Sequence, residues 1–201
     1  SGAFNANAMK RAAAILEERE PQFESVSLAL VGRKARDYFR SRRASQISRT
    51  WTDIGTVEYR HAVEIAEHVS KRFTSGEVDE VVLVFNEFVS ALSQVPRDLV
   101  ALPLVPEQTE GEVEEAIPFD IEPDAETVYS VLIPNALEFS IYRVLLENQA
   151  GEHAARMTAM ESATRNTEEL ISSLTLQFNR ARQAAITKEL VEIVTGAQAL
   201  E

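Results

Sequence analysis

The sequence predicts an α/β protein in two parts, a layered α/β domain followed by one long helix that forms a coiled coil. Over the first half of the chain, short apolar runs suited to buried strands alternate with segments of helical periodicity. Residues 135–195 contain no strong helix breaker, and this stretch of roughly 60 residues would be about 90 Å long as one helix. Its apolar residues recur at alternating steps of three and four, which is the spacing of a heptad seam.

Helices and strands are expected to alternate along the first part of the chain. Helical periodicity covers residues 5–18, and Pro21 stops this helix. An apolar strand at 25–31 follows and ends at Gly32, where the chain turns. The later elements are a short helix at 34–40, a strand at 46–51, an amphipathic helix at 56–73, and strands at 80–85 and 98–105.

The connections between these elements predict the kind of sheet. Gly76 stands where the C-terminal cap of the amphipathic helix is expected. The last two strands are joined by a short connection that indicates a hairpin, and Pro103 places the final strand at an edge or near its end. The remaining strand–helix–strand order is typical of a Rossmann-like layered domain with a mostly parallel sheet. We therefore expect an α/β domain at 1–123 and a helical shaft at 124–201.

The long helix carries a weak seam, because several of its positions are small or polar. The seam consists of Met157, Met160, Thr164, Thr167, Ile171, Leu174, Phe178, Ala181 and Ala185. Beyond Ala185 the apolar stripe moves by one residue and continues at Ile186, Leu190, Ile193 and Ala197. We expect this stripe to be exposed, or to be buried against a neighbouring copy of the chain through self-association.

Composition excludes several classes of function. A net charge of −12 argues against nonspecific binding to nucleic acid or to anionic lipid. The absence of cysteine excludes disulfides and thiolate metal sites. No apolar run reaches the roughly 20 residues that span a bilayer, and the first residues do not resemble a signal peptide.

No motif in the chain predicts catalysis. Neither glycine-rich phosphate-binding fingerprint is present, and the single glycine of Gly32-Arg33-Lys34 indicates an ordinary turn between strand and helix. His61 and His68 are seven residues apart, whereas a zinc pair on a helix prefers four. We therefore expect no catalytic residue, no metal and no cofactor.

Several segments resemble the gamma subunits of F-type ATP synthases. GAFNAN at 2–7 resembles that family's turn after its first strand, NEFVSALSQVP at 86–96 its turn between two strands, and IEPDAETV at 121–128 its entry into the C-terminal helices. The C-terminal helix carries the family signature, formed by Ile186, Thr187, Glu189, Glu192, Gly196 and Ala197. The resemblance covers essentially the whole chain, but the family's N-terminal helix and first strand have no counterpart. It therefore implies an N-terminally truncated fragment in which the seam has lost its partner helix.

The resemblance implies a central rotor stalk rather than an enzyme. Such a subunit couples rotation of the membrane proteolipid c-ring to the catalytic beta subunits, with alpha, beta and epsilon subunits as partners, peripheral to the cytoplasmic face of the cell membrane. The positions that this resemblance implies will face the alpha–beta ring are Arg156, Arg182, Gln183, Thr187, Glu189 and Glu192. Glu122 is expected near epsilon or the c-ring. The alternative is a free-standing α/β adaptor that dimerises through its coiled-coil helix.

Overall fold

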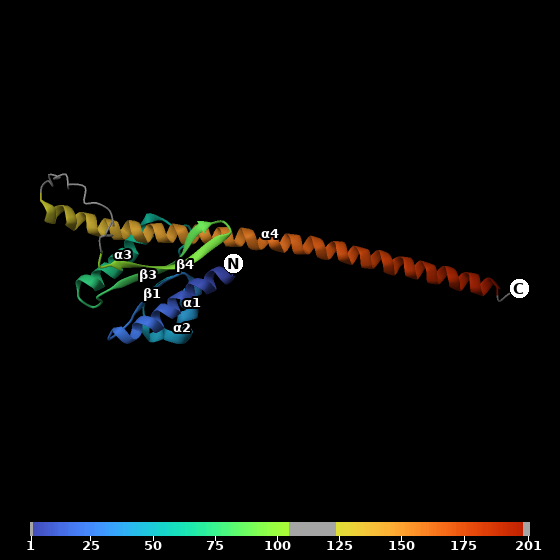
Figure 1. Ribbon diagram of the computed structural model, residues 1–201, viewed down its shortest axis with the longest axis horizontal. Helices are drawn as coiled ribbons and strands as arrows, with labels where there is room; N and C mark the ends of the chain where they lie inside the picture. The colour runs from blue at the N-terminus through green and yellow to red at the C-terminus, as the bar shows by residue number, and fades with distance from the viewer. Residues whose placement is uncertain (1, 105–123, 199–201) are drawn as a thin grey trace, which may run out of the picture. The chain divides into compact units, whose positions relative to one another are not determined.

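The computed structural model of the chain describes residues 2–104 and 124–198, which form four helices, four strands and two short 3-10 turns (Figure 1). The chain divides into two compact units, unit 1 at Ser1–Ala155 and unit 2 at Arg156–Glu201. The predicted division at 123/124 assigns the whole long helix to the second part. In the structure, the first part of that helix packs within the α/β unit instead.

Unit 1 begins with a helix and a parallel pair of strands. Its first elements are α1 (Gly2–Arg19), η1 (Glu20–Gln22), β1 (Leu28–Val31), α2 (Arg33–Arg43), η2 (Ala44–Gln46) and β2 (Ile47–Trp51). β1 and β2 pair in parallel, with Leu30 opposite Thr50, and α2 supplies the crossover that a parallel pair requires. Leu16 of α1, Leu30 and Phe39 of α2 form one buried cluster. Both helices therefore share a core with β1.

The other two strands form a hairpin. β3 (Val81–Ser90) and β4 (Ser93–Leu102) are antiparallel, with Asn86 opposite Pro96. The turn between two strands expected at 86–96 is present but shorter than that segment, because both strands continue until only residues 91 and 92 separate them. Each strand of a two-stranded ribbon has an open edge, where a proline removes no ladder hydrogen bond, so Pro96 is compatible with β4.

The α/β class with a small parallel sheet and a long C-terminal helix is confirmed. The described strands nevertheless form two separate sheets, β1–β2 and β3–β4, and only the first is parallel. A parallel connection needs a crossover of about a dozen residues or more. The two residues between β3 and β4 allow only an antiparallel return, so the sheet is less parallel than predicted.

Local capping fixes the ends of α3 (Tyr59–Thr74). At its start, the side chain of Glu58 accepts a hydrogen bond from the backbone N–H of His61, and the N–H of Glu58 donates to Nδ1 of His61 at 3.0 Å. At its end, Gly76 has a φ of 74°, and its N–H donates to the carbonyl of Phe73 at 3.0 Å. The expected glycine cap is therefore confirmed.

The long helix is α4 (Ala125–Gln198). Asp124 caps it, since Oδ1 accepts a hydrogen bond of 2.7 Å from the N–H of Thr127. The helix is predicted over residues 135–195, but it begins before Pro134, which lies inside α4. A proline within a helix costs about 3 kcal/mol. Burial of Leu137 and Ile141, both 2% exposed, directly after it offsets that cost.

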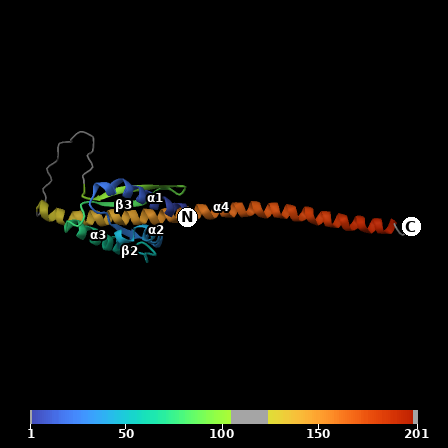
Figure 2. The same cartoon turned by 90° about the horizontal axis from the view of Figure 1, so that it is seen from below.

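The main core of unit 1 forms where α3, the hairpin and the first part of α4 meet. Leu137 and Ile141 of α4 pack in one buried cluster with Trp51, Ile65 of α3 and Leu102 of β4. In the view of Figure 2, the hairpin and α3 lie on opposite sides of this part of α4. The part of α4 that contains Leu137 and Ile141 is thus held from several directions.

Candidate protein-interaction site

The predicted seam of α4 is exposed in unit 2. Its five large apolar side chains are each more than half exposed, from 53% at Leu174 to 66% at Phe178. Leu137 of the same helix is 2% exposed, so residues of equal hydrophobicity lie in opposite environments. A helix cannot bury its own apolar stripe. The exposed stripe expected from the sequence is confirmed, and a row of apolar side chains of this length marks an interaction site.

The polar positions of the seam do not prevent it from being covered. The hydroxyl of Thr164 donates to the carbonyl of Met160 at 3.0 Å, and that of Thr167 to the carbonyl of Ala163 at 2.7 Å. Each hydroxyl is therefore satisfied within α4 and leaves its methyl group available for packing. Another helix could cover these positions without burying an unpaired donor.

The apolar stripe changes direction beyond Ala185. Ile186, Leu190 and Ile193 are 50%, 57% and 68% exposed. Moving a stripe by one residue turns it by about 100° around a helix. The apolar side chains beyond Ala185 therefore lie to one side of the row formed by Ile171 and Phe178, and the last turns of α4 present a neighbouring face.

The residues expected to face the alpha–beta ring lie on exposed turns of unit 2, in two rows. Arg182 and Glu189 are seven residues apart and share a face, with Glu192 one turn further on. Gln183 and Thr187 are four apart and form a second row. Glu192 is also bound by Lys188, whose Nζ lies 3.7 Å from its carboxylate.

Four other predicted positions lie outside these two rows. Arg156 is exposed at the first turn of unit 2. Gly196 is exposed in the last turns of α4, where a Cβ would contact nothing within 4 Å. Glu122 lies outside the described residues, and for Ala197 only its place within α4 is described.

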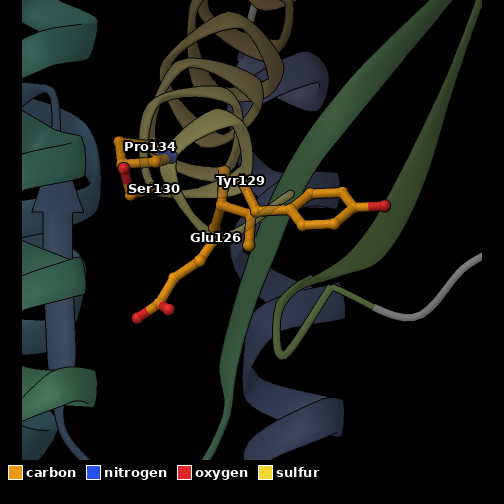
Figure 3. Close-up of a pocket in the computed structure, with 5 residues that line it drawn as sticks. Glu126, Tyr129, Ser130 and Pro134 are labelled. Atoms are coloured by element: carbon orange, nitrogen blue, oxygen red, sulfur yellow. The ribbon is translucent and has the colours of Figure 1, made fainter. Parts of the chain in front are cut away.

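A second apolar surface, at the start of α4, was missed by the sequence analysis. Tyr129, Val131 and Leu132 are 53%, 58% and 53% exposed. Figure 3 shows the side chains of Glu126 and Tyr129 pointing away from each other around an open hollow that Ser130, Ile133 and Pro134 also line. The signal was present in the sequence, because residues 127–137 contain no charge.

The two histidines of α3, His61 and His68, both make contacts that support the fold. Besides the capping role of His61, the ring of His68 packs edge-on against Trp51, with centroids 5.5 Å apart. Burial lowers the pKa of His68 below the ordinary histidine value, and the positive charges of Arg49 and Arg72 lower it further. Residues 2–104 and 124–198 contain no group of three potential metal ligands and no helix long and apolar enough to cross a membrane.

The fold and the exposed seam define a class: an α/β protein whose C-terminal helix is built to pair with other protein surfaces. The ATP synthase family model matches residues 1–200. The ATP synthase gamma chain of Anaeromyxobacter sp. (strain Fw109-5) is 48% identical over all of this chain and 69% of its own length. That of Pelotomaculum thermopropionicum is 46% identical over the same shares. The chain belongs to the ATP synthase family, among the gamma chains.

Solved structures share the fold. A chain of the Tetrahymena thermophila mitochondrial ATP synthase central stalk and c-ring aligns with 81% of this chain and 70% of its own, with a TM-score of 0.63 and 23% identity. A chain of the Euglena gracilis mitochondrial ATP synthase, in the structure of OSCP, F1 and c-ring, aligns with 95% of this chain and 67% of its own, with a TM-score of 0.64 and 20% identity. These similarities support the mixed α/β fold with its long helix.

Proposed function

We propose that the chain is the central rotor stalk subunit of a proton-translocating ATP synthase. The observation that carries this proposal is the exposed heptad seam of α4, in a chain that belongs to the gamma-chain family. A second helix pairs with the seam up to Ala185 and makes α4 one half of a stiff two-helix shaft. Beyond Ala185 the stripe turns away, so the last turns contact the surrounding subunits.

The physical task of such a subunit is to transmit torque. Moving one charge through 100 mV supplies about 2.3 kcal/mol, so several ions must act together for each ATP. A packed pair of helices is stiff enough to carry the combined work from the proteolipid c-ring to the catalytic beta subunits. Because the shaft is asymmetric, its rotation places each beta subunit against a different surface in turn and changes the nucleotide affinity there.

The contacts with the alpha–beta ring are assigned to the exposed polar rows of unit 2. The guanidinium of Arg182 can bind a carboxylate through two parallel hydrogen bonds, and Gln183 and Thr187 offer uncharged polar groups on the neighbouring row. Arg156, Glu189 and Glu192 complete the set. Small residues between them, such as Ala184, allow close approach without a deep interlock that would stop rotation.

The remaining contacts are assigned to unit 1. Glu122 and the apolar start of α4 face the epsilon subunit or the c-ring. The chain performs no catalysis itself, and it is held at the cytoplasmic face of the cell membrane through the rest of the complex.

Co-purification tests the proposal directly. A tagged chain is expressed with the alpha and beta subunits, and the complex is isolated through the tag. We expect alpha and beta to elute with the chain, and Leu174→Asp in the seam to lower their yield more than Leu176→Asp, an equally exposed leucine off the seam. A chain that elutes as a dimer of itself without alpha or beta would instead support the free-standing adaptor.

A further inference from the structure

Gly151 leaves a notch in α4 that an aromatic ring of α1 occupies. A Cβ at Gly151 would lie 2.8 Å from Cε2 of Phe4 and 3.3 Å from Cγ of Gln94. Real Cβ atoms essentially never come as close to another carbon as 2.8 Å. Phe4 is 6% exposed, so its ring is buried in this contact. Glycine is disfavoured inside helices, and here its lack of a side chain is what admits the ring.

A buried amide lies beside the notch. Asn86 of β3 is 1% exposed, and its Nδ2 donates to the carbonyl of Phe4 at 3.0 Å. The backbone N–H of Asn86 donates to Oδ1 of Asn148, on α4 one turn before Gly151, at 3.5 Å. One strand residue thus connects the start of α1 with α4. We call these four residues, Phe4, Asn86, Asn148 and Gly151, the Gly151 interlock.

Charged side chains further along α1 also hold this helix against the β3–β4 hairpin. Nε and Nη2 of Arg11 both donate to Oδ1 of Asp98 on β4, at 3.1 Å and 2.6 Å. Arg19 forms an ion pair with Glu80, the residue before β3. The ring of Phe4 is therefore carried by a helix that is tied to the hairpin at several points along its length.

The contacts in the interlock are directional, unlike the apolar core around Leu137. Apolar contact alone is non-directional, and hydrogen bonds and steric fit are what define one orientation of the helix about its axis. A turn of α4 by one residue, about 100°, would replace Gly151 at the Phe4 ring with Ala150 or Glu152. Neither leaves the space that the ring occupies.

We propose that the Gly151 interlock fixes the orientation of α4 about its own axis within unit 1, so that torque applied to unit 1 turns α4 instead of slipping past it. Gly151, Phe4 and Asn86 are then positioning residues for coupling between ion flow and ATP. This inference rests on the proposed rotor function, and it assigns the coupling to one place in the fold.

Substitution of the glycine tests the interlock in the assembled ATP synthase, in inverted membrane vesicles. Gly151→Leu is compared with Ala150→Leu, which adds the same side chain at the exposed neighbouring position. ATP hydrolysis and ATP-driven proton uptake are measured at equal amounts of assembled complex. We expect Gly151→Leu to lower proton uptake per ATP hydrolysed by about threefold, and Ala150→Leu to leave this ratio unchanged.

A parallel loss of both activities, at an unchanged ratio, would mean that Gly151 is only a packing residue and would overturn the proposal. If the unaltered chain does not assemble with alpha and beta, the proposed function is overturned, and the interlock proposal that rests on it is overturned too. If the Gly151→Leu complex assembles and its proton uptake per ATP hydrolysed is unchanged, the interlock proposal is overturned but the proposed function is not.

A crosslink covers the case in which Gly151→Leu does not assemble. The chain has no cysteine, so Phe4→Cys with Gly151→Cys introduces a single pair. Because the double substitution removes both the Phe4 ring and the glycine, the reduced variant should show about a threefold lower proton uptake per ATP hydrolysed. Oxidation should restore this ratio, since the disulfide then joins α1 to α4. Inhibition on oxidation that is reversed by a reductant would show that α1 and α4 move against each other during turnover, which contradicts a fixed interlock.

Discussion

The hydroxyl of Tyr59, at the first turn of α3, donates a hydrogen bond of 2.6 Å to Oε2 of Glu138 on α4. The ring of Tyr59 also lies edge-on to Tyr142, with centroids 5.5 Å apart. Residues 79 positions apart are thus joined by one polar contact. The hydrogen bond to Glu138 raises the pKa of Tyr59 above the ordinary tyrosine value, and desolvation and the negative charge add to this effect.

This contact predicts a dependence of stability on alkaline pH. Because the pKa of Tyr59 is higher in the folded chain, the protonated hydroxyl stabilises the fold. The contribution is complete below the unfolded pKa of about 10 and is lost as pH rises through the folded pKa. Tyr59→Phe should lower the thermal midpoint at pH 8 and flatten its fall above pH 10, measured by circular dichroism. An alkaline fall as steep as that of the parent chain would contradict the assignment.

The surroundings of His68 predict that stability also depends on acidic pH. Burial, together with Arg49 and Arg72, lowers its pKa in the folded chain. The neutral ring therefore stabilises the fold above the unfolded pKa of about 6.5, and this stability is lost as pH falls through the folded pKa. His68→Gln should reduce the loss of thermal midpoint between pH 7 and pH 5. His153→Gln, at an exposed position of α4, is the control and should retain the full loss.

The two environments of α4 predict unequal costs for the same substitution. Leu137→Ala removes a side chain that is 2% exposed and should destabilise unit 1 by about 2–5 kcal/mol. Leu176→Ala, at a position 53% exposed, should change stability by no more than about 0.5 kcal/mol. Urea unfolding of each variant measures both values. Equal costs would mean that the first part of α4 is not held by the core.

The assignment of Arg182 to the alpha–beta contact predicts a face-specific effect of charge reversal. Arg182→Glu should weaken co-purification with alpha and beta by about tenfold, since loss of a charged hydrogen-bonding partner is worth about 1.5–3 kcal/mol. Arg180→Glu makes the same change two residues away, on a different face of the helix. If both reversals reduce binding equally, net charge rather than a specific contact determines the association.

Local periodicity determined much of this protein. The continuity of α4 over residues 135–195, its seam and the shift of the stripe after Ala185 follow from spacing that repeats every three or four residues. The structure reproduces these features, but α4 begins earlier than predicted, at Ala125. The same holds for α3 and its Gly76 cap. These features depend on residues close in the sequence, whose geometry the backbone period fixes. The family signature at 186–197 likewise lies within one continuous helix.

Only the tertiary structure decided which part of α4 is covered. Leu137 and Leu174 are the same residue type in the same helix, yet one lies in the core and the other is exposed. The sequence likewise does not reveal that Gly151 admits the Phe4 ring, that Tyr59 reaches Glu138, or that Asn86 lies between two helices. Each of these contacts joins residues far apart in the chain. Their free energy depends on the packing of whole elements, which no local pattern encodes.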